Sequence, residues 1–137
     1  IRLPGTGILS LGEVEVMGYV IGLVNLALHG NARQSSTYSS TFPASKAVDG
    51  DMMSGFTHTE EPSTDGPWWE VDLEFPSVIR TISVYNRASC CQERLIGALI
   101  SLHRVNSQGN FEELVEQEFG TSEAVMTVDF TEEIYAA

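Results

Sequence analysis

Basic residues are scarce in this sequence: seven Lys and Arg face nineteen Asp and Glu among 137 residues, so the net charge is −12 at pH 7. A protein that binds nucleic acid neutralises phosphates with lysine and arginine, so this charge balance argues against a nucleic-acid partner. Electrostatic attraction to an anionic lipid surface is disfavoured for the same reason. The composition remains compatible with divalent cations and with neutral ligands.

Long apolar runs are also missing. The longest, residues 14–28, is broken by a glutamate, two glycines and an asparagine, and a transmembrane helix needs about 20 predominantly apolar residues. The chain opens with Ile1-Arg2-Leu3-Pro4 and carries no signal-peptide pattern. We therefore expect one domain, excised from a larger secreted, extracellular protein, with any export signal outside it.

Enzyme signatures are absent. The sequence has no His-Glu-x-x-His motif, no phosphate-binding glycine-rich loop and no Gly-x-Ser-x-Gly motif. The two cysteines, Cys90 and Cys91, are the nucleophile candidates, and no histidine lies near them in the sequence. Neighbouring cysteines either bond to each other or stay reduced, and both states remain open at this point. We expect a binding protein, not an enzyme.

A helical apolar stripe is missing too, and the pattern has a period of two residues instead. Apolar and polar residues alternate in five segments, at 9–16, 69–74, 78–85, 98–103 and 125–130. Such alternation predicts strands with one buried face. The segment 111–119 comes nearest to a helical pattern, and we expect a turn or short helix there. Several short strands separated by turns predict an antiparallel β-sandwich or barrel.

Two of the seven basic residues, Arg87 and Arg94, fall in one loop directly after a predicted strand. Two guanidinium groups in a loop suit an oxygen-rich ligand, but they equally suit surface pairing with acids such as Glu93. His58 follows Phe56-Thr57, and a lone loop histidine is most often a surface residue. These residues are candidates for a site, with the surface interpretation left open.

A second cluster reads Asp49-Gly50-Asp51. It resembles part of a calcium loop, in which a turn brings carboxylates and backbone carbonyls onto a hard cation. The pattern lacks the acid that closes a twelve-residue calcium loop, since Met52 and Met53 follow. A solvated turn is therefore the simpler interpretation of this motif taken alone.

Together these segments resemble the F-type, fucose-binding lectins, a branch of the discoidin-like family. The resemblance rests on the segments 25–27, 47–51, 57–59, 67–73, 84–87 and 90–95. It covers most of the chain, and its ordered set of histidine, arginine, paired cysteines and arginine is specific. The resemblance implies an all-β antiparallel sandwich of the jelly-roll type.

The order of the segments departs from the family. Residues 1–16 resemble the family's last strand but come first, so we expect a circular permutation within one lectin domain spanning 1–137. In this interpretation residues 17–24 join the old termini and residues 25–137 form the remainder. Sandwich termini lie close together and tolerate such rejoining. The lectin modules attached to cholesterol-dependent cytolysins are the members that this chain most resembles.

The resemblance implies that His58, Arg87 and Arg94 hold the sugar with fixed hydrogen-bond donors. It also implies a Cys90–Cys91 disulfide that forms an apolar plate against the sugar. Tyr38 is added as an aromatic contact, because it is the sole aromatic residue between Gln34 and Ser40.

The family's structural Ca²⁺ would be held here by the side chains of Glu13 and Asp49. Carbonyl groups of Lys46 and Asp51 would add to it, with one more ligand at Ser54 or the next residue, Gly55.

Two departures affect the expected site. Ser89 stands where members usually carry an acid that orients the basic residues, so their alignment must depend on other contacts. Gly12 and Phe56 replace a cysteine pair that bridges the domain in some members, and their joint loss suggests that they face each other.

We expect a calcium-stabilised lectin that binds fucose on cell-surface glycans of blood-group or Lewis type. Its partners would be fucosylated glycans, and it would target a larger secreted protein such as a pore-forming toxin without inserting into the membrane itself. The alternative is a discoidin-like membrane or protein adhesion domain. That function would use exposed apolar loop tips, for which the candidates are Tyr38, Phe42, Met52, Met53 and Phe56.

Overall fold

A computed structural model of the chain describes residues 1–19, 23–53, 55–60, 66–75 and 77–136. The elements within these ranges are strands and two short 3₁₀ helices, η1 (Ala44–Ala47) and η2 (Gln92–Leu95). The strands are β1 (Glu13–Tyr19), β2 (Leu23–Asn25), β3 (Asn31–Gln34), β4 (Trp69–Asp72), β5 (Ser77–Tyr85), β6 (Leu99–Val105), β7 (Phe111–Glu118) and β8 (Val125–Ala136). The expected all-β class with antiparallel sheets is confirmed. No helix in the described ranges is long and apolar enough to cross a membrane.

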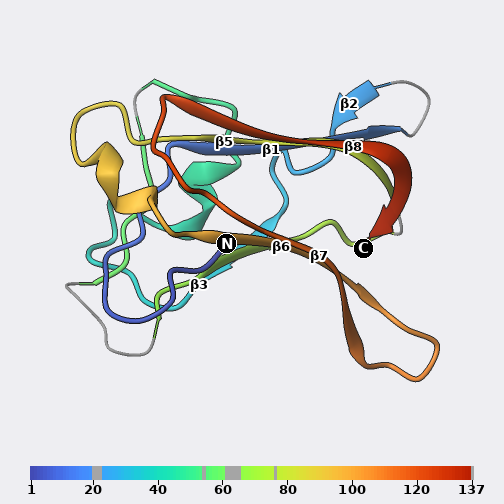
Figure 1. Cartoon of the computed structure of the whole chain (residues 1–137). Coiled ribbons are helices and arrows are strands. Elements are labelled where there is room, and N and C mark those ends of the chain that lie inside the picture. The colour runs from blue at the N-terminus through green and yellow to red at the C-terminus, as the bar shows by residue number, and fades with distance from the viewer. Residues whose placement is uncertain (20–22, 54, 61–65, 76, 137) are drawn as a thin grey trace.

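One layer is a four-stranded antiparallel sheet with the order β2-β1-β5-β8 (Figure 1). β5 lies inside it, paired with β1 on one side and with β8 on the other. Its sequence, SVIRTISVY, is rich in β-branched residues, which favour a pleated, half-buried surface. Because β1 lies within this sheet, residues 13–19 belong to the same folded unit as β5 and β8. The permuted order relative to the family stays a prediction.

The opposite layer consists of two two-stranded ladders, β3-β4 and β6-β7. Arg2 forms isolated antiparallel bridges to Trp68, directly before β4, and to Leu99, the first residue of β6. The first residues of the chain therefore lie between the two ladders and link them into one layer, opposite the four-stranded sheet (Figure 1).

The core lies between the two layers. Alternation along the strands turns Val14, Val16 and Ile82 of the four-stranded sheet inward. They belong to the same core cluster as Trp69 of β4 and Ile100 of β6, and none of the five is more than 5% exposed. Full burial of an apolar side chain of this size stabilises the fold by about 1.5–3 kcal/mol.

A buried segment before β1 fixes residues 57–59. The backbone amides of Leu9 and Leu11 donate to the hydroxyl oxygens of Thr59 and Thr57, at 2.9 and 3.0 Å. The amides of Thr57 and Thr59 donate in return to the carbonyl oxygens of Leu11 and Leu9. Leu9 and Leu11 were expected in a strand, and they make these bonds outside any strand. His58 therefore lies between two buried threonines, each of which forms two hydrogen bonds with the segment before β1.

Three further details differ from the sequence expectations. The segment 111–119, expected as a turn or short helix, is the strand β7, held by its pairing with β6. Its residues are mostly exposed, so a one-sided apolar alternation is missing. The expected joining segment 17–24 contains the end of β1 and the start of β2, which pair with each other. β3, the short polar strand NARQ, carried no apolar pattern at all.

Candidate functional site

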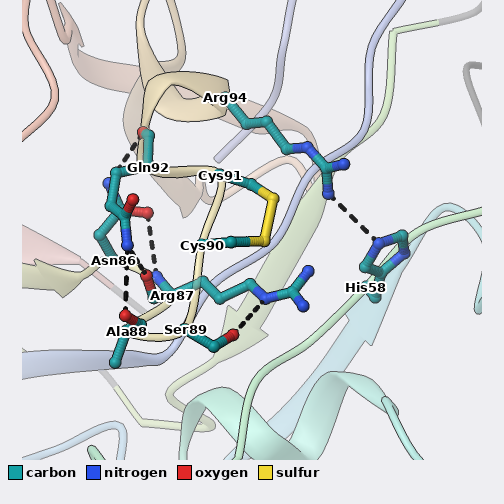
Figure 2. Close-up of a disulfide and its surroundings, with 9 residues drawn as sticks. All are labelled: His58, Asn86, Arg87, Ala88, Ser89, Cys90, Cys91, Gln92 and Arg94. Atoms are coloured by element: carbon teal, nitrogen blue, oxygen red, sulfur yellow. Dashed lines mark hydrogen bonds between the residues drawn. A yellow bond between two sulfur atoms is a disulfide. The ribbon is translucent and has the colours of Figure 1, made fainter.

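Two side-chain amides shape the loop that carries both candidate arginines. The buried Asn86 donates from Nδ2 to the carbonyl oxygens of Gln92, at 2.9 Å, and Glu123, at 3.3 Å. Gln92 donates from Nε2 to the carbonyl oxygen of Arg87, at 2.9 Å. The loop is thus closed on itself (Figure 2). Arg87 and Arg94 therefore extend from a fixed backbone.

A disulfide between Cys90 and Cys91 forms part of this loop. Cys91 has a φ of 68°, in the left-handed region, and it directly precedes η2. Leu95, at the end of η2, is fully buried and anchors the short helix to the core. In Figure 2 the disulfide lies between the side chains of Arg87 and Arg94. The sulfur atoms thus place an apolar surface between two cationic groups.

His58 faces Arg94 across the site (Figure 2). Its Nδ1 lies 2.5 Å from the carbonyl oxygen of Thr59, and its Nε2 lies 3.3 Å from Nη1 of Arg94. A carbonyl oxygen only accepts, so Nδ1 carries the hydrogen, and Nε2 of the neutral ring accepts from Arg94. His58 as a whole is 8% exposed. The geometry therefore gives Nε2 of His58 the role of an acceptor, where the family resemblance implies a donor.

Arg87 is held without a carboxylate. Its Nε donates to the hydroxyl oxygen of Ser89 at 2.9 Å, and its Cζ lies 3.9 Å from the ring centroid of Phe56. Burial, and then the positive charge of Arg94, lower the pKa of Arg87. Among the described residues, neither arginine forms an ion pair. The surface alternative of pairing with Glu93 is therefore not what the structure shows.

Aromatic rings line the side of the site next to His58. The ring centroid of Tyr38 lies 4.9 Å from that of His58, and the backbone amide of Tyr38 donates to the carbonyl oxygen of His58 at 3.0 Å. Phe42 stacks on Phe56 with 4.6 Å between centroids. Tyr38 is 53% exposed, so its ring remains available to a ligand.

The predicted sugar contacts are thus brought together. Arg87 and Arg94 offer N–H donors in rigid forks, His58 offers an acceptor, and the disulfide and Tyr38 offer apolar surface. This combination suits an uncharged ligand that carries several hydroxyl groups and one apolar face. Neither cysteine is a free thiol. Both nucleophile candidates named from the sequence are therefore bonded to each other in the disulfide.

Glu13 lies beside the turn at Asp49–Asp51. Its carboxyl is buried, and its Oε1 accepts from the backbone amide of Gly50 at 3.1 Å, whereas no described group donates to its Oε2. Burial raises the pKa of Glu13 to about 7, the Gly50 hydrogen bond opposes this, and the negative charge of Asp49 adds to it. A buried carboxylate oxygen without a donor beside a second carboxylate fits a hard cation such as Ca²⁺.

The other expected calcium ligands lie around the same turn. Asp49 pairs with the ammonium of Lys46 at 3.7 Å and accepts from the backbone amide of Asp51 at 2.9 Å. The side chain of Asp51 accepts from the amide of Met53, and Ser54 lies outside the described residues. In the described ranges no group of three or more His, Cys, Asp or Glu gathers as a metal site. A cation here would thus depend on two carboxyl groups and backbone carbonyls.

Sequence reasoning missed the residues that orient the arginines. The sequence marks Phe56 only as a replaced cysteine or an exposed loop tip, and Ser89 only as the replacement of an acid. Asn86 and Gln92 lie within the segments that carry the family resemblance, but the sequence indicates no role for them. The signal that was available is that Asn86 and Gln92 flank the arginine-cysteine segment, where side-chain amides often close loops. No sequence signal connects Phe56 to Arg87.

The comparisons with known proteins agree with this arrangement. Residues 46–137 match the family described as NedA-like, galactose-binding domain. These residues include His58, Arg87, the disulfide and Arg94. Glu13 and Tyr38 lie before the matched segment.

Among curated proteins, the chain is similar to fucolectin-3 from Anguilla japonica, with 38% identity over 91 residues, 61% of this chain and 51% of that protein. It is also similar to a pentraxin fusion protein from Xenopus laevis, with 31% identity over 103 residues, 72% of this chain and 24% of that protein. The chain therefore spans about half the length of the fucolectin and less of the fusion protein.

Among solved structures, the chain is similar to an F-lectin, or fucolectin, from the serum of Morone saxatilis. The TM-score is 0.61 at 31% sequence identity, over 82% of this chain and 40% of that chain. This likeness agrees with the sandwich described above.

Proposed function

The chain belongs to the NedA-like, galactose-binding domain family, and from this premise we propose that it is a fucose-binding lectin module. The observation that carries the proposal is the site around the Cys90–Cys91 disulfide, where Arg87 and Arg94 face His58 (Figure 2). The similarity to fucolectins and to the F-lectin of striped bass supports fucose as the sugar. The module binds its ligand and does not transform it.

Hydrogen bonds to sugar hydroxyls come from the three polar side chains. Arg87 uses its Nε on Ser89, which leaves its terminal nitrogens as donors. Arg94 uses one nitrogen on His58 and keeps the others. The Nε2 of His58 accepts, so it suits a hydroxyl that donates. A sugar hydroxyl both donates and accepts, so one hydroxyl can satisfy His58 and an arginine together.

Apolar contacts would select the sugar. Fucose carries a methyl group where most hexoses carry a hydroxymethyl group, and the disulfide and the Tyr38 ring supply apolar surface for it. A methyl-sized pocket alone discriminates by only about ten- to two-hundredfold. The directed hydrogen bonds of Arg87 and Arg94 add selectivity, because a sugar with a differently oriented hydroxyl leaves them unpaired.

Calcium is part of the proposal as a structural cation. Glu13 and Asp49 would hold it with their carboxylates, and the backbone carbonyls of Lys46 and Asp51, with Ser54 or Gly55, would complete its oxygen shell. The cation would be the partner of the buried Oε2 of Glu13, which accepts no hydrogen bond from the described residues. Glu13 belongs to β1, so the cation would tie that strand to the 49–51 turn.

The aromatic contacts favour this function over the membrane-adhesion alternative. Tyr38, Phe42 and Phe56 pack around His58 or Arg87, so three of the five candidate loop tips form the wall of the sugar site. Met52 and Met53, which are 40% and 83% exposed, remain as solvent-facing tips. Exposed methionine alone is weak support for a membrane anchor.

The biological role follows from the same proposal. We infer that the module recognises fucose on extracellular glycans of blood-group or Lewis type and targets a larger secreted protein, with pore-forming toxins such as lectinolysin as the model. The name of the serum F-lectin supports an extracellular location.

Titration calorimetry with L-fucose tests the function directly. We expect a saturable signal with one site per chain, a weaker one with galactose and none with glucose. The test also includes vesicles of neutral and anionic lipid. Binding to vesicles without any response to fucose would overturn the lectin proposal in favour of the adhesion alternative.

A further inference from the structure

The two arginines of the proposed sugar site lack acidic partners in a chain that is rich in acids. The protein has nineteen acidic and seven basic residues. Four of the basic residues each pair with a carboxylate, namely Arg2, Arg33, Lys46 and Arg104. Within the described ranges, Arg80, Arg87 and Arg94 pair with none, and two of these three meet in the sugar site. The site therefore carries positive charge that the described part of the protein leaves uncompensated.

The neighbours that orient these two guanidinium groups are neutral. Arg87 donates from Nε to the hydroxyl oxygen of Ser89 at 2.9 Å, and its Cζ lies 3.9 Å from the ring centroid of Phe56. Arg94 donates from Nη1 to Nε2 of the neutral His58 ring at 3.3 Å. The positive charge of Arg94, added to burial, lowers the pKa of Arg87. These contacts thus fix the direction of both groups without cancelling their charge.

Both guanidinium groups face the same space. In Figure 2 they extend past the disulfide toward the side on which His58 lies. No hydrogen bond between described residues uses Nη1 and Nη2 of Arg87 or Nε and Nη2 of Arg94. A guanidinium fork matches the geometry of an oxyanion. The three terminal oxygens of a sulfate ester can accept from both forks at once, whereas a carboxylate has two oxygens and a hydroxyl group has one.

We propose that this site takes O-sulfated fucose in preference to neutral fucose, with the sulfate group held between Arg87 and Arg94. The inference rests on the proposed function, because the sugar ring still needs His58, the disulfide and Tyr38. Sulfation of one ring hydroxyl leaves the methyl group of fucose unchanged, so its apolar contacts are kept. The added negative charge meets the two cations that a neutral sugar leaves uncompensated.

The acidity of the whole chain weakens this attraction without cancelling it. The net charge is −12, but the Debye length is about 8 Å at physiological ionic strength, so carboxylates farther away are largely screened. A sulfate in contact with two guanidinium groups is screened much less. Hydrogen bonds between charged partners are also roughly twice as strong as those between neutral ones. The local contacts therefore decide the preference.

The test is titration calorimetry at about 0.15 M salt with L-fucose, its 2-, 3- and 4-sulfates, and inorganic sulfate. We expect at least one fucose sulfate to bind at least about tenfold more tightly than fucose. Inorganic sulfate should bind at least about tenfold more weakly than that fucose sulfate, because it makes no contact with the disulfide or with Tyr38. Fucose itself is the arm that tests the proposed function.

A charge placed beside Arg87 supplies the discriminating variant. Ser89→Asp puts a carboxylate next to the Arg87 guanidinium, where it both pairs with that cation and repels a sulfate. The ratio of the affinity for the fucose sulfate to that for fucose should fall by about threefold or more. The matched control is Ser107→Asp, at an exposed turn between β6 and β7, which should keep the wild-type ratio. Circular dichroism checks that both variants are folded.

Four outcomes would contradict the proposal, and they fall at different steps. Fucose sulfates that bind no more tightly than fucose would exclude the preference and leave the lectin function standing. Inorganic sulfate that binds as tightly as the fucose sulfates would indicate an anion site without sugar recognition. An unchanged affinity ratio in folded Ser89→Asp would show that the charge at Arg87 is not its source. Absence of binding by fucose and by all three sulfates would overturn the proposed function itself.

Discussion

The guanidinium of Arg87 lies over the ring of Phe56, with 3.9 Å between Cζ and the ring centroid. This contact, together with the hydrogen bond from Arg87 to Ser89, orients a cation that has no carboxylate partner in the described part of the chain. A ring face attracts a guanidinium through its quadrupole and also stacks on its plane. The contact with Phe56 therefore orients Arg87, which an acidic side chain would otherwise do.

Phe56→Leu should weaken fucose binding while the protein stays folded. Leucine keeps apolar volume but removes the ring face under Arg87. A cation–π contact contributes about 0.5–2 kcal/mol, which corresponds to a loss of about two- to thirtyfold in affinity. Titration calorimetry with fucose measures the loss, and circular dichroism checks the fold.

Phe56→Tyr is the matched control, because it retains the ring, and it should bind nearly as well as the wild type. Adding Ser89→Asp to Phe56→Leu should restore part of the affinity through an ion pair with Arg87. If Phe56→Leu bound fucose as tightly as the wild type, the ring would have no part in orienting Arg87.

Both arginines should be needed for binding. Arg87→Ala or Arg94→Ala removes hydrogen bonds to a charged donor worth about 1.5–3 kcal/mol, so affinity should fall about tenfold to more than a hundredfold. Arg87→Lys should also fail, because one ammonium does not reproduce the planar fork. The exposed Arg104, paired with Glu112 at 2.9 Å on the β6-β7 ladder, supplies the control Arg104→Ala. Folded arginine variants with unchanged affinity would place the sugar site elsewhere.

The salt dependence should distinguish a neutral sugar from an anionic ligand. Arg87 and Arg94 are cationic, but fucose carries no charge, so screening by salt has no ion pair to weaken. We expect the dissociation constant for fucose to change less than about twofold between 0.05 and 0.5 M salt. A steep loss of affinity with salt would indicate that the arginines hold an anion instead.

The sequence predicted β5 and β4 well, since Val78–Tyr85 and Trp69–Asp72 each bury one face and so show a clear alternation. It missed β3 and misjudged β7 because their side chains are largely exposed. Those strands are defined by backbone pairing, which leaves no trace in the apolar pattern.

The residues of the candidate site were likewise only partly predictable from the sequence. Arg87, Cys90, Cys91 and Arg94 lie in one segment, so a sequence motif can represent them. Phe56 comes from a different loop and meets Arg87 only through the fold, so no local pattern connects the two. The acceptor role of His58 likewise depends on where the carbonyl of Thr59 lies, which spacing alone does not reveal.

Removing calcium should lower the melting temperature of the protein. The buried carboxyl of Glu13 lies beside the partly exposed carboxyl of Asp49, and one oxygen of Glu13 has no donor among the described residues. A cation that binds only the folded state stabilises it by mass action, by about 2.7 kcal/mol at a hundredfold excess over the dissociation constant. The measurement is thermal unfolding of calcium-free protein, with and without added Ca²⁺, with Mg²⁺ as the comparison ion.

The variant Glu13→Gln separates a calcium site from a merely strained carboxyl. Glutamine is close to glutamate in shape but carries no charge, so the buried repulsion with Asp49 disappears. The calcium-free variant should therefore melt at or above the temperature of the calcium-free wild type, and added Ca²⁺ should no longer raise it. The control is Glu116→Gln in the β6-β7 ladder, where Glu116 pairs with Arg2. This variant should keep the full rise in melting temperature with Ca²⁺. If wild type and Glu13→Gln gained the same stability from Ca²⁺, the cation would bind elsewhere, and the buried Oε2 of Glu13 would have to be explained without it.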